Sequence, residues 1–196
     1  MTRFLYFVTH PNVVIDRDVP VPRWPLSELG AQRMRNSLGQ PWIAEVTSIY
    51  CSTEQRAIDG AAILSKHLSL GFTEVHALGE NDRSSTGFLA PAEFERVADE
   101  FFAKPTASVR GWERAVDAQD RIASAVECIA ATDRTSGTIA IVSHGAVGTL
   151  LHCKLAGEEI DRRYDQPPNG GGNYFRLSLA PPKVYSWWLP ADQPAA

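Results

Sequence analysis

The chain has 196 residues and a mass of 21.5 kDa, which suffices for one domain with a complete hydrophobic core. Apolar residues make up 44% and charged residues 21%, which excludes wholesale disorder. A net charge of -4 with no basic block argues against a nucleic-acid partner, and no apolar stretch is long enough to span a membrane.

The cysteines and the amino terminus bear on the cellular compartment. Cys51, Cys128 and Cys153 lie in apolar segments without metal-ligand spacing, so we expect buried thiols in a reducing compartment. The apolar start is only about six residues long and lacks a cleavage site, unlike a secretory signal. The prediction is a cytoplasmic protein.

The first element is an apolar run over residues 4–8 that stops at Thr9, His10 and Pro11. So short a run predicts a strand that is buried on both faces, as in the middle of a parallel sheet. In open α/β sheets ligands bind at the carboxyl ends of the strands, where His10 would lie. Pro11 forces a turn there. A structural role for this single histidine stays open.

A proline-rich surface loop and then a helix should follow. Ser27 is a suitable N-cap, and the apolar residues Leu29, Met34 and Leu38 precede the stop at Gly39.

Residues 46–51 are rich in β-branched side chains and predict a second strand. Ser52 and Gln55 match a capping box, so a helix should begin at once, with Arg56 in its first turn. If the first two strands are parallel, Arg56 lies at the same sheet edge as His10. An exposed arginine on a helix surface is the alternative.

Residues 72–78 predict a third strand, and the polar loop 79–87 after it contains Glu80, Asp82 and Arg83. An amphipathic helix over 92–103 fits a lid or cap at the sheet edge, and a longer amphipathic helix is expected over 112–131.

Residues 138–142 predict another buried strand, which ends in Ser143, His144 and Gly145 before a helix begins. Free backbone amides and the helix dipole make such a helix start favourable for an anion. A strand that ends in histidine therefore occurs twice in this chain.

Residues 173–179 and 183–188 predict two antiparallel strands joined by Pro181 and Pro182. The preceding glycine-rich loop, 167–172, lacks the lysine and the strand-to-helix setting of a nucleotide-binding P-loop. We expect most of Trp24, Trp42, Trp187 and Trp188 to fill the core.

This order of elements predicts an α/β fold in three layers. It is a mostly parallel, doubly wound sheet with helices on both faces, an antiparallel edge strand and a small helical cap. We expect one domain over 1–196, with the cap inserted at about 79–111.

The carboxyl ends of the strands would then bring together His10, Arg56, Glu80 and His144. Their spacing suits a metal poorly but suits phosphoryl transfer.

These residues resemble the histidine phosphatase superfamily, the phosphoglycerate-mutase-like proteins. The shared features are the strand ending in His10, residues 25–30 before the first helix, residues 52–57 with Arg56, Glu80 after the third strand, and residues 143–145. The resemblance implies a phosphohistidine on His10, with Arg56 and His144 holding the phosphoryl group. It also implies that Glu80 donates the proton and that no metal is needed.

The family signature Arg-His-Gly is altered here to Thr9, His10 and Pro11. The loss of one charge-assisted contact in a preorganised site commonly costs about 3 to 4 kcal/mol. Arg83 could supply the missing cation, or it could be a solvated surface residue, and Asp82 competes with Glu80 as proton donor. We predict substrate contacts from the neighbours of the catalytic positions, Thr9, Asn12, Arg83 and Gly145.

The leading hypothesis is a metal-independent phosphatase that acts on a small phosphomonoester and needs no cofactor. A mutase is disfavoured because no further basic residues would hold a doubly phosphorylated ligand. The alternative is a catalytically impaired family member that binds a phosphorylated ligand or a partner protein. A redox or nucleotide-binding protein lacks the necessary motifs. Self-association stays open.

Overall fold

The computed structural model describes residues 3–193. Seven strands form one sheet in the order β3-β2-β4-β1-β5-β6, with β7 paired to β5. Four strands run parallel: β1 (Phe4–Thr9), β2 (Val46–Cys51), β3 (Phe72–Glu74) and β4 (Thr138–Ser143). Three antiparallel strands extend the sheet beyond β1: β5 (Asn173–Leu179), β6 (Pro182–Val184) and β7 (Leu189–Pro190).

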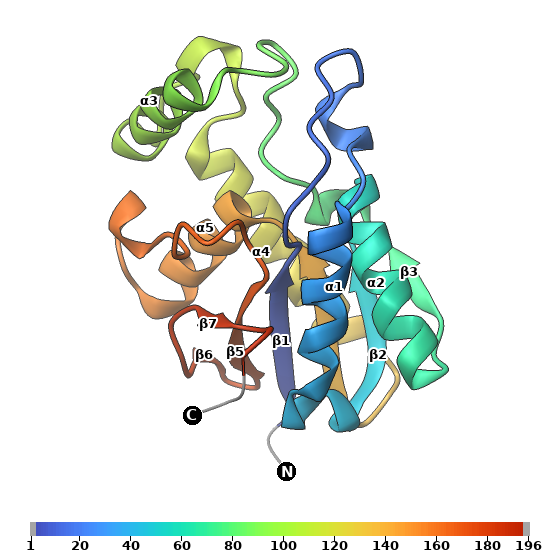
Figure 1. Cartoon of the computed structure of the whole chain (residues 1–196). Helices are drawn as coiled ribbons and strands as arrows, with labels where there is room; N and C mark the ends of the chain where they lie inside the picture. Colours follow the sequence, from blue (N-terminus) through green and yellow to red (C-terminus); the bar gives the residue numbers. More distant parts are fainter. Residues whose placement is uncertain (1–2, 194–196) are drawn as a thin grey trace.

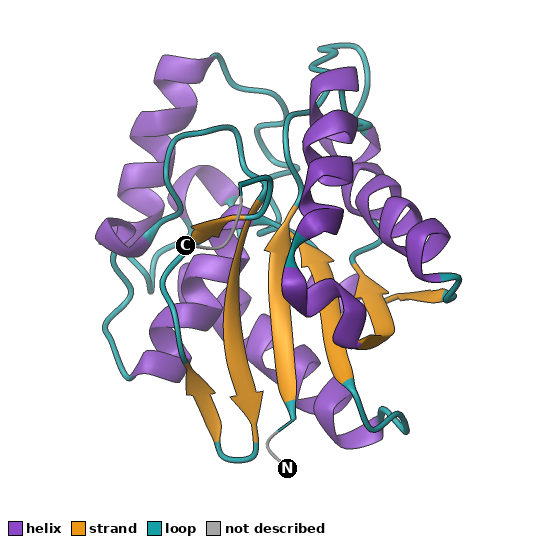
Figure 2. Ribbon diagram, turned by 60° about the horizontal axis from the view of Figure 1, so that its bottom comes forward, coloured by secondary structure: helices purple, strands orange, loops and turns teal. Residues whose placement is uncertain are grey.

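Residues 3–193 form five α-helices, which lie on both faces of this sheet and, in one case, above the carboxyl ends of its parallel strands (Figures 1 and 2). They are α1 (Glu28–Asn36), α2 (Gln55–Leu68), α3 (Pro91–Ala103), α4 (Ala115–Thr132) and α5 (Gly145–Ala156). Apolar residues of α1 and α2 share a core with one face, and those of α3, α4 and α5 share a core with the other. The predicted three-layer α/β fold with a mixed, mostly parallel sheet is therefore confirmed.

The central strand β1 shows why its run of residues is apolar throughout. Leu5 and Phe7 belong to the core under α4 and α5, whereas Tyr6 and Val8 belong to the core under α1 and α2. Alternate side chains of a strand point to opposite faces, so a strand that is covered twice needs apolar residues at every position.

The pairing of β1 with β4 brings the two histidine segments together. The strands are parallel neighbours, and Thr9 is in register with Ser143. The next residue on each strand is a histidine, and the His10 N–H donates to the Ser143 carbonyl over 3.0 Å. The fold therefore places His10 beside His144, 134 positions later in the chain.

Three predicted boundaries differ from the structure. The third strand ends at Glu74 and continues as a 3-10 turn, His76–Leu78. The strand expected over 183–188 ends already at Val184, as β6, and β7 begins only at Leu189. The fourth helix begins at Ala115, because a 3-10 turn, Val109–Gly111, precedes Trp112. Hydrophobic patterning marks buried segments, but it does not distinguish a strand from a short turn.

The predicted capping box is wrong. The Ser52 N–H still donates to the Val142 carbonyl over 3.1 Å, as an extension of the β2–β4 pairing. The α2 helix begins only at Gln55, and Glu54 stands at the N-cap without a side-chain capping bond. Ser52 is therefore part of the sheet edge and not of the helix.

One smaller prediction also needs correction. Cys51 and Cys153 are buried thiols, but Cys128 is exposed, because it lies on the outer side of α4. Of Trp24, Trp42, Trp187 and Trp188, all but Trp187 are buried, which confirms that most of them fill the core.

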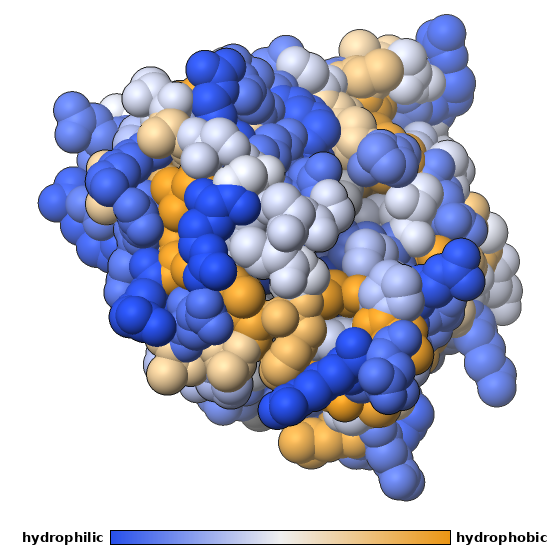
Figure 3. Space-filling view, turned by 90° about the horizontal axis from the view of Figure 1, so that it is seen from above, coloured by the Kyte–Doolittle hydropathy of each residue, from blue (hydrophilic) through white to orange (hydrophobic). Residues whose placement is uncertain are grey.

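Two long segments rise above the carboxyl ends of the parallel strands (Figure 1). One follows β1, and the other contains the loop after β3 and helix α3. Seen from above, this end of the molecule is mostly hydrophilic, with small apolar groups between the polar ones (Figure 3). The second segment contains the residues 79–111 for which we predict a cap, and that role stays a prediction. Within residues 3–193, no helix has the length and the apolar character that a membrane span requires.

Candidate active site

Two histidine rings face each other at the carboxyl ends of β1 and β4. The ring centroids of His10 and His144 are 5.1 Å apart, and the ring planes meet at 66°. His144 is fully buried and His10 is partly buried. The structure therefore brings together the two histidines that the sequence analysis singled out.

His10 is held with one ring nitrogen free of a proton. Nδ1 lies 2.9 Å from the Pro11 carbonyl oxygen, to which it donates, while Nε2 accepts from Arg56 Nε over 3.0 Å. Burial and the neighbouring Arg56 guanidinium lower the pKa of His10 to about 3. The ring is therefore neutral near pH 7, and its Nε2 lone pair can act as a nucleophile once the hydrogen bond from Arg56 is released.

A glycine-rich loop supports the backbone of His10. Gly170, Gly171 and Gly172 have φ of +82°, +81° and +70°, values that side chains other than glycine rarely adopt. The Gly172 N–H donates to the His10 carbonyl over 3.2 Å, and a Cβ on Gly171 would lie 2.2 Å from that oxygen. Only glycine at position 171 allows this approach to the histidine.

Arg56 connects His10 with its surroundings. Its side chain is 3% exposed and extends from the first turn of α2. Beyond its bond to His10, the guanidinium donates to the Val21 carbonyl over 2.6 Å and pairs with the Glu54 carboxylate. This position agrees with the prediction that Arg56 lies at the same sheet edge as His10. It does not agree with the alternative of an exposed arginine on a helix surface.

His144 is held by groups from the end of β2. Its Nε2 lies 2.6 Å from Ser52 Oγ and 3.3 Å from Glu54 Oε1. Burial, then the nearby Arg56 and His10, lower the pKa of His144 well below its ordinary value. A carboxylate beside Nε2 favours the tautomer with the proton on Nε2, so this neutral ring can still donate a hydrogen bond.

Glu80 caps the amino terminus of α5. Its Oε2 accepts from the Ala146 N–H over 3.2 Å, and its Oε1 accepts from the Val147 and Asn81 N–H groups, each over 3.1 Å. These amides are free at a helix start, and the helix dipole favours a carboxylate there. Glu80 therefore lies next to His144, with its oxygens directed toward the backbone.

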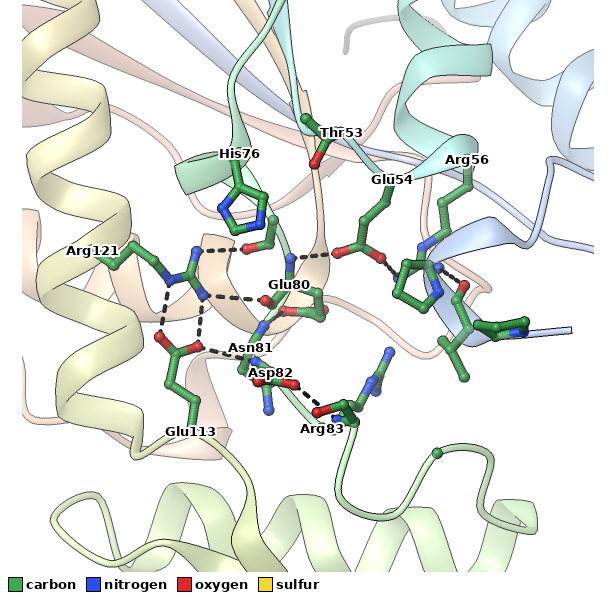
Figure 4. A pocket seen from close by; sticks show the side chains of 16 residues that line it. Thr53, Glu54, Arg56, His76, Glu80, Asn81, Asp82, Arg83, Glu113 and Arg121 are labelled. Carbon is green, nitrogen blue, oxygen red and sulfur yellow. Dashed lines mark hydrogen bonds and ion pairs between the residues drawn. The ribbon is translucent and has the colours of Figure 1, made fainter.

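A cavity of about 660 Å³ lies above these residues (Figure 4). Its walls come from the loop after β1, the start of α2, the loop after β3 and helix α4; the charged lining residues are Glu54, Arg56, Glu80, Asp82, Arg83, Glu113 and Arg121. Arg56 and Glu54 both line the cavity and contact the histidine rings below it. They are therefore the groups that a ligand meets on the way to His10.

Arg121 of α4 holds the wall that carries Glu80. Its guanidinium donates to the carbonyls of Ala77, Gly79 and Glu80 and pairs with Glu113 over 2.7 Å. Arg83 points from the loop toward Arg56, and its guanidinium carbon lies 5.0 Å from the centre of the Phe94 ring (Figure 4).

The other predicted substrate contacts lie outside this cavity lining. The buried Thr9 hydroxyl donates to Gln166 Oε1 over 2.8 Å and accepts from the Asn173 N–H over 3.0 Å. Asn12 Oδ1 accepts from Arg33 over 2.9 Å. Gly145 is the first residue of α5, where a Cβ would lie 2.3 Å from Gln166 Nε2. Substrate contact by these three residues stays a prediction.

Sequence reasoning missed Ser52 and Glu54. Both precede Arg56 directly at the carboxyl end of β2, and that position was the available signal. The capping-box interpretation assigned Ser52 to a helix, while Glu54 belonged to no motif. Among residues 3–193, no group of three or more His, Cys, Asp or Glu side chains is arranged to hold a metal ion.

Comparison with known proteins agrees with this arrangement. A sequence profile described as the histidine phosphatase superfamily (branch 1) matches residues 15–178, a range that begins after His10. No curated protein matches the sequence significantly.

Three solved structures illustrate the similarity of fold. Bacillus stearothermophilus YhfR is 23% identical with a TM-score of 0.78, covering 97% of this chain and 100% of its own. A mycobacterial glucosyl-3-phosphoglycerate phosphatase with inorganic phosphate is 21% identical with a TM-score of 0.77, covering 97% and 99%. A putative alpha-ribazole-5'-P phosphatase from Escherichia coli is 14% identical with a TM-score of 0.69, covering 97% and 98%.

Proposed function

The chain belongs to branch 1 of the histidine phosphatase superfamily, and from this membership we propose that it is a metal-independent phosphatase. It hydrolyses a small phosphomonoester through a phosphohistidine on His10. The observation that carries the proposal is the neutral His10 ring, whose Nε2 lone pair lies beside Arg56 and His144.

The first step is an in-line attack of His10 Nε2 on phosphorus. The N–P bond forms as the bond to the ester oxygen breaks, and the leaving alkoxide takes up one proton. Arg56 and the Nε2–H of His144 stabilise the negative oxygens of the transferred group. In the second step water attacks the phosphohistidine, a carboxylate accepts the water proton, and inorganic phosphate is released.

The size of the cavity supports a small organic phosphate as substrate. A volume of about 660 Å³ lies within the range of small-molecule sites and exceeds what one phosphate needs. Two related structures are named as phosphatases of glucosyl-3-phosphoglycerate and of alpha-ribazole-5'-P. A phosphate ester with a polar organic group of modest size fits this cavity best.

A second candidate is a catalytically impaired member that binds a phosphorylated ligand or a partner protein. Thr9 favours it, because the signature arginine is absent and the threonine hydroxyl is bound to Gln166 and Asn173. The pairing of Arg56 with Glu54 above the histidines also restricts access to His10 in this structure.

A screen of phosphomonoesters in the presence of a chelator separates the two candidates. The phosphatase predicts turnover of at least one ester by the wild type and its loss in His10→Ala. Phosphate-ester binding without turnover above the His10→Ala background supports the impaired member instead.

A further inference from the structure

The Glu54 carboxylate lies where several hydrogen-bond donors converge. One oxygen pairs with the Arg56 guanidinium. The other accepts from the Glu80 N–H over 2.7 Å and lies 3.3 Å from His144 Nε2. The side chain is 12% exposed and lines the cavity (Figure 4). An internal carboxylate therefore engages the same Arg56 and His144 that the proposed function assigns to the phosphoryl group.

Substrate binding must rearrange these contacts. A phosphoryl group that takes over Arg56 and His144 leaves Glu54 anchored by one oxygen to the Glu80 amide. The oxygen that had faced Arg56 is then free beside the bound phosphate. Two negative groups at this distance repel each other, and the proton that a phosphomonoester monoanion carries removes the repulsion when it passes to the carboxylate. Substrate binding would then place a protonated carboxyl beside the ester oxygen.

The other carboxylates of the cavity are less suited to carry a proton. Both oxygens of Glu80 accept from backbone amides of Asn81, Ala146 and Val147, so protonation would disturb the start of α5. Asp82 is exposed and accepts from the Ser84 N–H within its own loop over 2.9 Å. Glu113, the remaining carboxylate of the cavity lining, pairs with Arg121 over 2.7 Å. None of these three carboxylates has a partner that the proposed phosphoryl contacts would remove.

We propose that Glu54 is the proton donor of the phosphatase reaction, an inference that rests on the proposed function. As His10 Nε2 bonds to phosphorus and the ester bond breaks, the Glu54 carboxyl gives its proton to the leaving oxygen. The resulting carboxylate takes a proton from the water that hydrolyses the phosphohistidine. That proton leaves with the inorganic phosphate, and Glu54 is again the carboxylate that pairs with Arg56.

The test compares two classes of ester in Glu54→Gln and Glu80→Gln. An alkyl phosphate has a poor leaving group that needs a proton, whereas 4-nitrophenyl phosphate has a good one that leaves without it. We expect Glu54→Gln to lower kcat/KM for the alkyl ester by roughly a hundredfold or more and to lower kcat/KM for the aryl ester far less. The variant should also accumulate phosphohistidine with the aryl ester, because the hydrolytic step lacks its base.

Equal losses on both esters in Glu54→Gln overturn the proposal, because a residue that only positions Arg56 cannot distinguish leaving groups. A loss selective for the alkyl ester in Glu80→Gln alone also overturns it. Thermal unfolding checks that each variant is folded, and binding of inorganic phosphate checks that its phosphate site is intact. Glu54→Ala provides a second substitution with the same expected selectivity. If the wild type shows no His10-dependent turnover of either ester, the proposed function itself fails.

Discussion

At the scale of single residues, Arg56 influences the site in two ways. Its Nε–H donates to the nitrogen that is proposed to attack, which keeps the lone pair of His10 directed into the site. Its positive charge also disfavours a second proton on that ring and so contributes to the low pKa of His10. Binding of a phosphate anion and neutrality of the nucleophile therefore depend on the same guanidinium.

The ionisation of His10 can be measured directly. In the folded wild type we expect the His10 ring to stay neutral down to about pH 4, because its pKa is about 3. Arg56→Met should raise that pKa by removing the cationic neighbour, and Arg17→Met, which alters an arginine over Phe88 outside the cavity lining, should not. Nitrogen-15 NMR of the imidazoles reports each value, and a wild-type His10 that titrates near 6.5 would refute this expectation.

Arg83 is the candidate to replace the arginine that the family signature has at the position of Thr9. It lines the cavity, points toward Arg56 and packs over Phe94, so a rotation of its side chain can bring a cation to a bound phosphate. We expect Arg83→Ala to lower kcat/KM by roughly a hundredfold and to weaken phosphate binding. The Arg17→Ala variant is the matched control, and unchanged turnover in Arg83→Ala would show that position 83 is merely a surface position.

At the scale of elements, the active edge depends on two neighbouring strands and on one glycine-rich loop. Strand pairing fixes the distance between the histidines, since residues in register on parallel strands have no freedom to separate. The loop of residues 170–172 then fixes the His10 backbone from the opposite side.

A pair of glycine substitutions tests this support. Gly171→Ala places a methyl group against the His10 carbonyl at φ +81°, so we expect a loss of about 1–3 kcal/mol of unfolding free energy. We also expect roughly a hundredfold lower turnover, because the nucleophile is displaced. Gly157→Ala has a comparable φ of +73° and open space around it, so it should lower stability without the loss of turnover. Equal activity of the two variants would contradict the supporting role.

The same elements show how far the sequence could predict the structure. Uninterrupted apolar runs identified β1 and β4, and the second residue after each run is the histidine that identified the site, His10 or His144. The order of the strands in the sheet comes from long-range pairing, and local patterns do not contain it. For this reason the sequence did not predict a role for Glu54. Its contacts are with Arg56, His144 and Glu80, which come from three different parts of the fold. Ser52 was misread because a strand end and a helix start compete for the same motif.

At the scale of the whole molecule, the buried neutral histidines make folding dependent on pH. Burial lowers the pKa of both His10 and His144 below the ordinary value of 6.5. For His10, the unfolded chain therefore binds a proton between pH 6.5 and about 3 that the folded chain does not. The contribution of His10 to stability is complete above pH 6.5 and declines as the pH falls through that interval, and His144 acts in the same direction.

Denaturant unfolding at a series of pH values measures this decline. We expect His10 to contribute a slope of about 1.4 kcal/mol per pH unit within the interval. Replacing His10 by asparagine should reduce the slope by about that amount, while His67→Asn, at an exposed position, serves as the control. Identical slopes for the wild type and His10→Asn would contradict the assigned ionisation.

The most direct test of the account is to trap the covalent intermediate. The wild type is mixed with a phosphomonoester in the presence of chelator, quenched with alkali, and analysed by intact mass and peptide mapping. The account predicts one added phosphoryl group per chain, located on His10, stable to alkali, labile to acid and absent from His10→Ala. Turnover without a phosphorylated His10, even in Glu54→Gln with the aryl ester, would contradict it.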